Sequence, residues 1–130
     1  MRSDAREAAF KIVFAKLFCK EQSGGFAASI YKSAKLSPEE KEFADRLVGC
    51  VGEHSEEFQS IISQRVVNYP EYRIYAADRA ILLIGLAEIK YFEDIPPLVS
   101  VSEAANLARK YSTERSADFV NGVLGGIINE

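Results

Sequence analysis

A run of apolar residues at positions 80–87 places the strongest constraint on how this 130-residue chain can fold. Residues 80–84 are apolar on every side, and a helix tolerates this only when other helices surround it. The run is eight residues long and includes Gly85, whereas a membrane span needs about 20 residues. We therefore expect a central helix over about 75–91, buried inside an all-α protein that has no membrane segment.

Other segments of helical periodicity are separated by the four prolines, Pro38, Pro70, Pro96 and Pro97. We expect helices over about 4–20, 26–34, 38–51 and 55–66, and two more that carry apolar stripes at 101–111 and 119–128. Pro70 and the two residues before it mark the best boundary between two helical halves. The prediction is one domain of about seven helices, with halves over about 1–68 and 74–130.

The clearest helix start lies at Ser37-Pro38. Ser37 can cap the helix, Pro38 suits its first position, and Glu40 completes a capping box. Gly52 can close the same helix.

The first helix is predicted to carry an apolar stripe on one side and a basic row on another. The stripe spans an arc of about 100° and consists of Phe10, Phe14, Leu17 and Phe18, which we expect to face the core. The basic row spans about 80° and consists of Arg2, Arg6, Lys16 and Lys20, with Val13 inside the same arc. Such a row can follow an RNA phosphate backbone, and the alternative is a solubilising face.

Two segments compete with an all-helical interpretation. Residues 98–102 alternate with period two, as a strand does, and Asn121-Gly122 between apolar pairs resembles a hairpin turn. The apolar residues around Gly122 repeat with helical spacing, so we favour a helix there. Close approach of another backbone would then explain why Gly122, Gly125 and Gly126 are tolerated.

The net charge of −3 conceals a gradient along the chain. Residues 1–20 hold five basic against two acidic residues, and residues 36–60 hold seven acidic against two basic. One basic and one acidic face, each for a different partner, would explain the gradient, although solvated helix faces would also do so. A second basic cluster combines Arg109, Lys110 and Arg115 with Tyr111, a mixture that suits unpaired RNA bases.

Catalytic and metal-binding patterns are nearly absent from the sequence. The single histidine, His54, has no evident nucleophile partner, no phosphate-binding glycine loop is present, and no CxxC pair suggests zinc. Cys19 and Cys50, in a chain without a recognisable export signal, indicate reduced thiols in the cytoplasm. We expect no enzyme activity, no cofactor and no metal.

Several motifs resemble the NusB family of transcription antitermination factors. They are DRAIL at 78–82, AEI at 87–89, IP at 95–96, SEAA at 102–105, ARKY at 108–111 and FVNGVL at 119–124. The segment 5–9 followed by Phe14 is similar to the family's opening helix, and Phe43, Leu47 and Gly49 fit the middle weakly. The resemblance covers nearly the whole chain and is most specific in its C-terminal half.

The resemblance implies an all-α, NusB-like fold and binding of boxA-type RNA from ribosomal RNA operons. It also implies ribosomal protein S10 (NusE) as a partner, within the antitermination complex of RNA polymerase. By position, Arg2 and Arg6 match the RNA-contacting N-terminal motif, and Phe119 with residues 113–116 lies near the RNA. Phe14 and Asp78 match part of the S10-facing surface.

The chain departs from the family pattern at its N-terminus, where Ser3 and Asp4 separate the two arginines. Fewer phosphate contacts predict weaker RNA binding and a shallower salt dependence, which Arg115 is expected to offset. Two alternatives stay open: a NusB-like rRNA-targeting module, and a protein–protein adaptor without RNA binding. A homodimer is a further open possibility.

Overall fold

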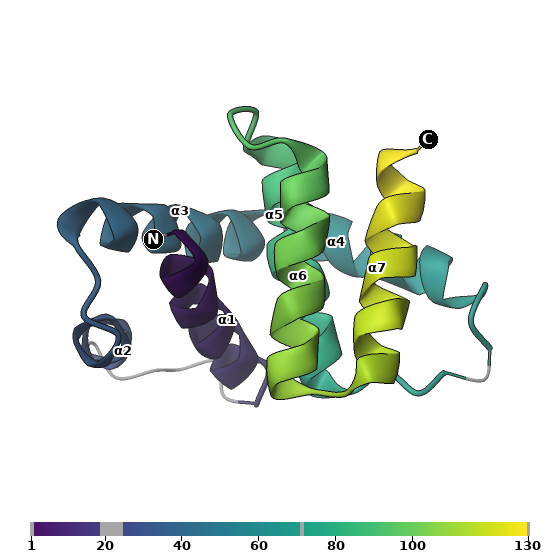
Figure 1. Cartoon of the computed structure of the whole chain (residues 1–130), viewed down its shortest axis with the longest axis horizontal. Helices are drawn as coiled ribbons and strands as arrows, with labels where there is room; N and C mark the ends of the chain where they lie inside the picture. Colours follow the sequence, from purple (N-terminus) through teal and green to yellow (C-terminus); the bar gives the residue numbers. More distant parts are fainter. Residues whose placement is uncertain (1, 19–24, 71, 130) are drawn as a thin grey trace.

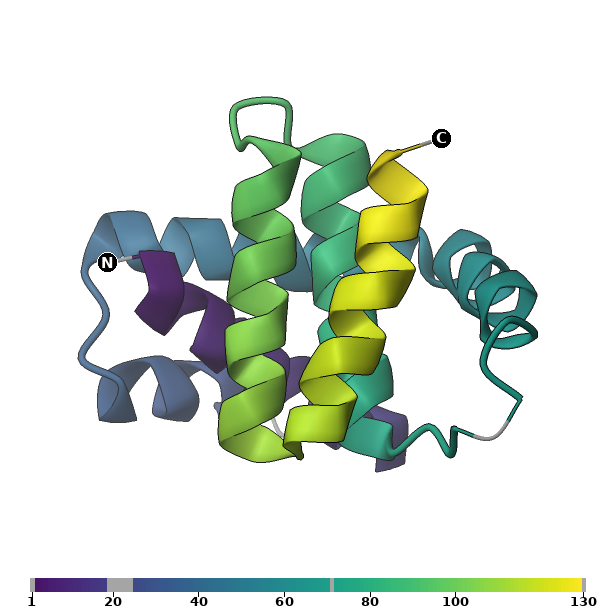
Figure 2. The ribbon, with the colours of Figure 1, turned by 45° about the vertical axis from the view of Figure 1, so that its right-hand side comes forward.

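The computed structural model describes residues 2–18, 25–70 and 72–129, which form seven helices and no strand (Figures 1 and 2). The helices are α1 (Arg2–Phe18), α2 (Phe26–Ser33), α3 (Pro38–Glu53), α4 (Ser55–Val66), α5 (Ala76–Tyr91), α6 (Pro97–Tyr111) and α7 (Glu114–Ile128). The predicted all-α fold is confirmed. Both strand alternatives are wrong, because residues 98–102 lie in α6 and residues 119–124 lie in α7.

Helix α5 occupies the centre of the molecule, as its apolar sequence predicts. Its residues 80–84 are at most 1% exposed, since α1, α3, α4, α6 and α7 all pack against it. Helices α6 and α7 run antiparallel beside each other and cover one side of α5 (Figure 2). Gly85 permits the approach of α7, because a Cβ atom there would lie 2.6 Å from Leu124 Cδ1.

The predicted core stripe of α1 is right at one end and wrong at the other. Phe10 is buried, but Leu17 is 36% exposed and Phe18 is 71% exposed. The buried face of α1 consists of Ala5, Arg6, Ala8, Ala9, Phe10, Ile12 and Val13. Helix α1 packs through its small alanines onto α3 and α5, so its last turn contributes little to the core.

The helix ends follow local chemistry. The capping box at Ser37 is confirmed, with Glu40 N donating to Ser37 Oγ at 3.2 Å and Ser37 N donating to Glu40 Oε1 at 2.9 Å. Gly52 does not end α3, which runs to Glu53, and His54 then joins α3 to α4.

The C-terminal glycines of α7 do not meet another helix backbone, so that prediction is wrong. A Cβ atom on Gly122 would lie 2.6 Å from the hydroxyl oxygen of Tyr69, which belongs to the α4–α5 connection. Apart from the adjoining residues and backbone of α7 itself, no heavy atom of the described chain lies within 4 Å of such an atom on Gly125, and the nearest one to Gly126 is Arg65 Nη1 at 3.7 Å.

Candidate functional site

An aromatic cleft of about 380 Å³ opens between the α4–α5 connection and the start of α7. We call it the aromatic cleft; it is lined by Tyr69, Pro70, Tyr72, Arg115, Asp118 and Phe119. The rings of Tyr72 and Phe119 stack with centroids 4.1 Å apart, and Tyr69 meets Phe119 edge-on at 5.1 Å. The guanidinium carbon of Arg115 lies 5.6 Å from the centroid of Tyr72. Aromatic rings beside an exposed guanidinium suit the stacking of a planar base.

Polar groups beneath the cleft hold Tyr72 in place. Its hydroxyl donates to Asp78 Oδ2 at 2.6 Å and lies 2.7 Å from Ser116 Oγ. Thr113 caps α7 by accepting from Ser116 N at 2.9 Å. Burial, together with the bond to Asp78, raises the pKa of Tyr72 to about 12, so the phenol stays protonated at neutral pH.

Two predicted site residues near this cleft lie in the interior. Asp78, which the resemblance assigns to the S10-facing surface, is 0% exposed, so its carboxylate is not accessible to a partner in this structure. The carboxylate is directed inward because it accepts from Tyr75 N at 3.0 Å as well as from Tyr72. Phe119 is 3% exposed, which places it in the core and leaves the two tyrosines as the accessible rings. Sequence reasoning missed Tyr69 and Tyr72, although the break at residues 68–70 marked their position.

The predicted basic row on α1 is broken, because Arg6 points inward. Arg6 is 4% exposed, and its Nε donates to Glu88 Oε2 on α5 at 2.8 Å. Its Nη1 lies 3.5 Å from Glu103 Oε1 on α6, and Ser100 Oγ donates to Glu88 Oε1 at 2.9 Å. The pairing satisfies a buried charge that would otherwise be costly. Arg6 therefore joins α1 to α5 and α6 in this structure.

The other three members of the basic row are Arg2, Lys16 and Lys20. Lys16 is exposed near the end of α1, and Lys20 lies outside the described residues. Arg2 is exposed beside a pocket of about 500 Å³ whose lining includes Phe43, Arg46 and the acidic residues Glu39, Glu40 and Glu42.

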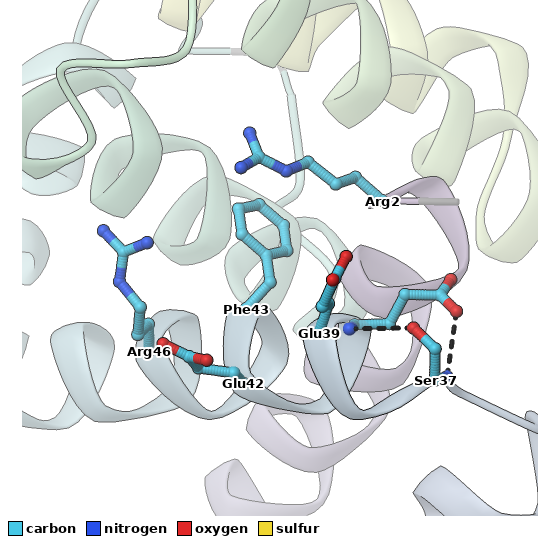
Figure 3. A pocket seen from close by; sticks show the side chains of 7 residues that line it. Arg2, Ser37, Glu39, Glu42, Phe43 and Arg46 are labelled. Atoms are coloured by element: carbon cyan, nitrogen blue, oxygen red, sulfur yellow. Dashed lines mark hydrogen bonds between the residues drawn. The ribbon is translucent and has the colours of Figure 1, made fainter.

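The two arginines that line the pocket beside Arg2, Arg2 itself and Arg46, each lie over a phenylalanine ring. Figure 3 shows Phe43 between the side chains of Arg2 and Arg46. The guanidinium carbon of Arg2 lies 4.6 Å from the Phe43 centroid, and that of Arg46 lies 4.4 Å from the Phe92 centroid. Arg2 also pairs with Asp94 at 3.3 Å. The acidic lining weakens this pocket as a phosphate site.

An apolar groove of about 570 Å³ lies on the exposed side of α1. We call it the apolar groove; it is lined by Phe10, Lys11, Phe14, Ala15, Phe18, Ala77 and Tyr111. Phe14 is half-buried and contacts Phe10 and Phe18 at centroid distances of 5.8 and 5.1 Å. The expected partner residue Phe14 thus lies in an open, ring-lined depression.

The predicted basic cluster around Tyr111 is divided between two surfaces. The Tyr111 ring lies 4.9 Å from that of Phe10, and its hydroxyl donates to Glu7 on α1. Burial and this bond raise the pKa of Tyr111 above its usual range. Lys110 also pairs with Glu7, at 2.9 Å, whereas Arg109 lies 3.5 Å from Glu114. Tyr111 is therefore a wall of the apolar groove, while Arg115 belongs to the aromatic cleft.

Reactive groups outside these surfaces are few in the described ranges. Burial raises the pKa of the Cys50 thiol to about 11, so this cysteine is a poor nucleophile at neutral pH. His54 stacks on Tyr91 at 3.9 Å, and its Nδ1 lies 3.5 Å from Glu57. No group of three or more His, Cys, Asp or Glu side chains in the described part of the chain converges on a metal position. Among these residues, no helix is long and apolar enough to span a membrane.

Comparison with solved structures finds the same fold over nearly the whole chain. A crystal structure of the antitermination factors NusB and NusE in complex with double-stranded RNA matches with a TM-score of 0.85 and 28% identity, covering 97% of this chain and 94% of the other. NusB of T. maritima matches with a TM-score of 0.83 and 29% identity, covering 100% of this chain and 92% of the other.

Curated relatives carry the name transcription antitermination protein NusB. The protein of Salinibacter ruber is 37% identical over 98% of this chain and 80% of its own length. That of Methylacidiphilum infernorum is 38% identical over 73% of this chain and 66% of its own length. That of Symbiobacterium thermophilum is 44% identical over 72% of this chain, and the match spans only 61% of its own length. Because a model of the NusB family also matches residues 3–129, the chain belongs to the NusB family.

Proposed function

We propose that this chain is an RNA-binding transcription antitermination factor. It binds boxA-type RNA of rRNA operon transcripts together with ribosomal protein S10 (NusE) and promotes readthrough by RNA polymerase. The observation that supports this most is the match over 97% of the chain to a NusB that was solved with NusE and RNA. The factor acts in the cytoplasm and has no catalytic activity of its own.

The two concave surfaces divide the binding between them. The aromatic cleft accepts unpaired bases, since Tyr69 and Tyr72 offer rings and Arg115 offers a guanidinium plane. Outside the cleft, phosphate contacts to the same RNA come from the exposed cations Arg2, Lys16, Arg109 and Lys110. The apolar groove accepts S10, because exposed phenylalanines such as Phe18 gain most by burial against a protein.

One observation favours a second candidate, the protein–protein adaptor without RNA binding. Of the two arginines in the N-terminal motif, Arg6 is buried and Arg2 is paired with Asp94. Few free cations therefore remain at that end of the chain to attract phosphates.

Fluorescence anisotropy with a short single-stranded boxA-type RNA and a scrambled control separates the two candidates. We expect preferential binding of the boxA-type RNA, tighter when S10 is present, and reciprocally tighter S10 binding when RNA is present. A transcription assay with a terminator downstream of boxA should then show readthrough that depends on the protein. Tight S10 binding with equal, weak affinity for both RNAs would favour the adaptor.

A further inference from the structure

We propose that Tyr72 is the base-stacking wall of the aromatic cleft and that Asp78 and Ser116 are positioning residues that hold it there. The inference rests on the proposed function, since it assigns residues within the RNA-binding surface. It also gives Asp78 a role different from the partner contact that sequence resemblance implied.

The hydroxyl of Tyr72 is held from two helices at once. It donates to Asp78 Oδ2 on α5 at 2.6 Å and lies 2.7 Å from Ser116 Oγ on α7. A phenol has a single hydroxyl hydrogen, so the Ser116 hydroxyl must be the donor in the second bond. Asp78 and Ser116 are both 0% exposed, and bonds to buried partners do not have to compete with water. Tyr72 is thereby fixed to both α5 and α7.

Both hydrogen bonds that Asp78 accepts are made at one of its two carboxylate oxygens. A single oxygen, Oδ2, accepts from the Tyr72 hydroxyl and from Tyr75 N. The other oxygen, Oδ1, is buried and makes no hydrogen bond within the described part of the chain. Substitution of Asp78 therefore acts first on Tyr72 and on the start of α5, and not on a surface contact.

The ring of Tyr72 is oriented for stacking. Phe119 stacks on the ring at 4.1 Å with an interplanar angle of 14°, and the Tyr72 side chain also lines the cleft. The exposed Arg115 side chain lies over the same ring, with its guanidinium carbon 5.6 Å from the centroid, so a base that enters the cleft stacks on the tyrosine as the guanidinium moves aside, or on the guanidinium itself. An unpaired nucleobase is the ligand that both groups recognise by stacking. A ring that is already held in place loses little conformational entropy when the base binds.

Tyr72→Phe tests the positioning bond with little risk to the fold, because the ring and the bond that Tyr75 N donates to Asp78 are kept. We expect the affinity for single-stranded boxA-type RNA to fall several-fold, with an unchanged salt slope. Tyr72→Ala, which removes the ring, should lower the affinity by about 5- to 150-fold, the equivalent of one lost base stack. The affinity for S10 measured without RNA should not change in either variant.

Tyr91→Phe is the matched control. The Tyr91 hydroxyl donates to Glu57 Oε1 at 2.6 Å, so the same kind of bond is removed at the opposite end of α5. This variant should bind RNA as the wild type does. NMR signals of the Tyr72 ring should shift when RNA is added, and those of Tyr91 should not.

Asp78→Asn completes a double-mutant cycle. Alone it should weaken RNA binding several-fold, and in the Tyr72→Phe background it should add little, because both changes remove the same anchor. Thermal unfolding of each variant identifies any loss that is due to misfolding. Should Asp78→Asn fail to fold, Tyr72→Phe and Tyr72→Ala decide the question.

Three outcomes would contradict the inference. RNA affinity equal to wild type in folded Tyr72→Phe and Tyr72→Ala would overturn it. So would a loss in Asp78→Asn that is confined to S10 binding, since this would return Asp78 to the partner surface. A wild-type chain that binds no boxA-type RNA would overturn the proposed function, and this inference with it.

Discussion

Two neighbouring residues at the start of α5 connect to the aromatic cleft and the apolar groove, yet the chemistry of the two surfaces differs. Ala77 lines the groove, and the next residue, Asp78, anchors the Tyr72 wall of the cleft. The cleft combines tyrosines with Arg115 and Asp118, whereas the groove is formed mainly by three phenylalanines of α1. The difference indicates that a polar, planar ligand fits the cleft and an apolar protein surface fits the groove. Under the proposed function, two neighbouring residues of α5 therefore adjoin the surfaces for two different partners.

The largest expected effect concerns the attachment of α1, which carries most of the groove. Arg6→Ala leaves the carboxylate of Glu88 buried without its partner, and we expect a loss of about 3–5 kcal/mol in the free energy of unfolding. Urea denaturation should measure this loss. Arg2→Ala is the control, because its ion pair with Asp94 is about half exposed on each side and should contribute at most about 1 kcal/mol. Equal stabilities for the two variants would show that the buried pair does not hold α1 in place.

The groove itself is tested by Phe18→Asp. Phe18 is 71% exposed, so the free energy of unfolding should change little. Burial of a charged side chain under S10 should weaken S10 binding by about 2 kcal/mol or more if Phe18 lies at the centre of the interface. Isothermal titration should detect this change, while RNA affinity without S10 stays constant. A variant that loses RNA affinity and keeps S10 affinity would exchange the roles of the two surfaces.

Arg115→Ala tests whether the charge at the aromatic cleft contributes to RNA binding. Besides its planar surface, the Arg115 guanidinium carries a charge for one phosphate of the bound strand, and its removal should flatten the dependence of log K on log salt by roughly 0.7 for a single strand. Anisotropy titrations over a range of salt concentrations measure this slope. Lys32→Ala is a suitable control, because Lys32 is an exposed cation on α2, outside both surfaces. An unchanged slope in Arg115→Ala would remove Arg115 from the phosphate contacts.

The smallest effect is expected for Gly122→Ala, below the cleft. Alanine favours a helix by about 1 kcal/mol over glycine, but the new Cβ must displace the Tyr69 hydroxyl, 2.6 Å away. We expect the two effects to offset each other in the melting temperature and RNA affinity to fall slightly as Tyr69 moves. Gly125→Ala is the control, since its new Cβ meets no described atom within 4 Å apart from the adjoining residues and backbone of α7 itself. It should raise the melting temperature and leave RNA binding unchanged.

The positions of the helices were predictable because their signals are local. Ser37 and Glu40 form the expected capping box, and α4 occupies residues 55–66 as its periodicity indicated. The apolar run at 80–84 likewise announced a buried central helix, and α5 is that helix. Each of these features depends on residues within a few positions of one another along the chain.

The candidate sites were only partly predictable from the sequence. Arg115 and Phe14, which the sequence singled out as an RNA-binding and a partner-binding residue, line the two concave surfaces, and their roles there stay predictions. Tyr69 and Tyr72 were missed, because two tyrosines beside a proline in a connecting segment have no periodicity that signals a site. Phe119 was left open between the core and the RNA surface, and its 3% exposure was decided by packing against the two tyrosines.

The sequence by itself determined that the described part of the chain forms seven helices around an apolar centre, since hydrophobic period and capping act within one or two turns. Only the tertiary structure decided which charged residues are available to a partner. Arg2 and Arg6 lie one turn apart on α1, yet Arg6 is buried because Glu88, 82 residues further along the chain, supplies its counter-charge. Asp78 is hidden for the same kind of reason, since it accepts from Tyr72 and Tyr75. A helical wheel gives the direction of a side chain, but the neighbours that pair with it are brought there by the fold.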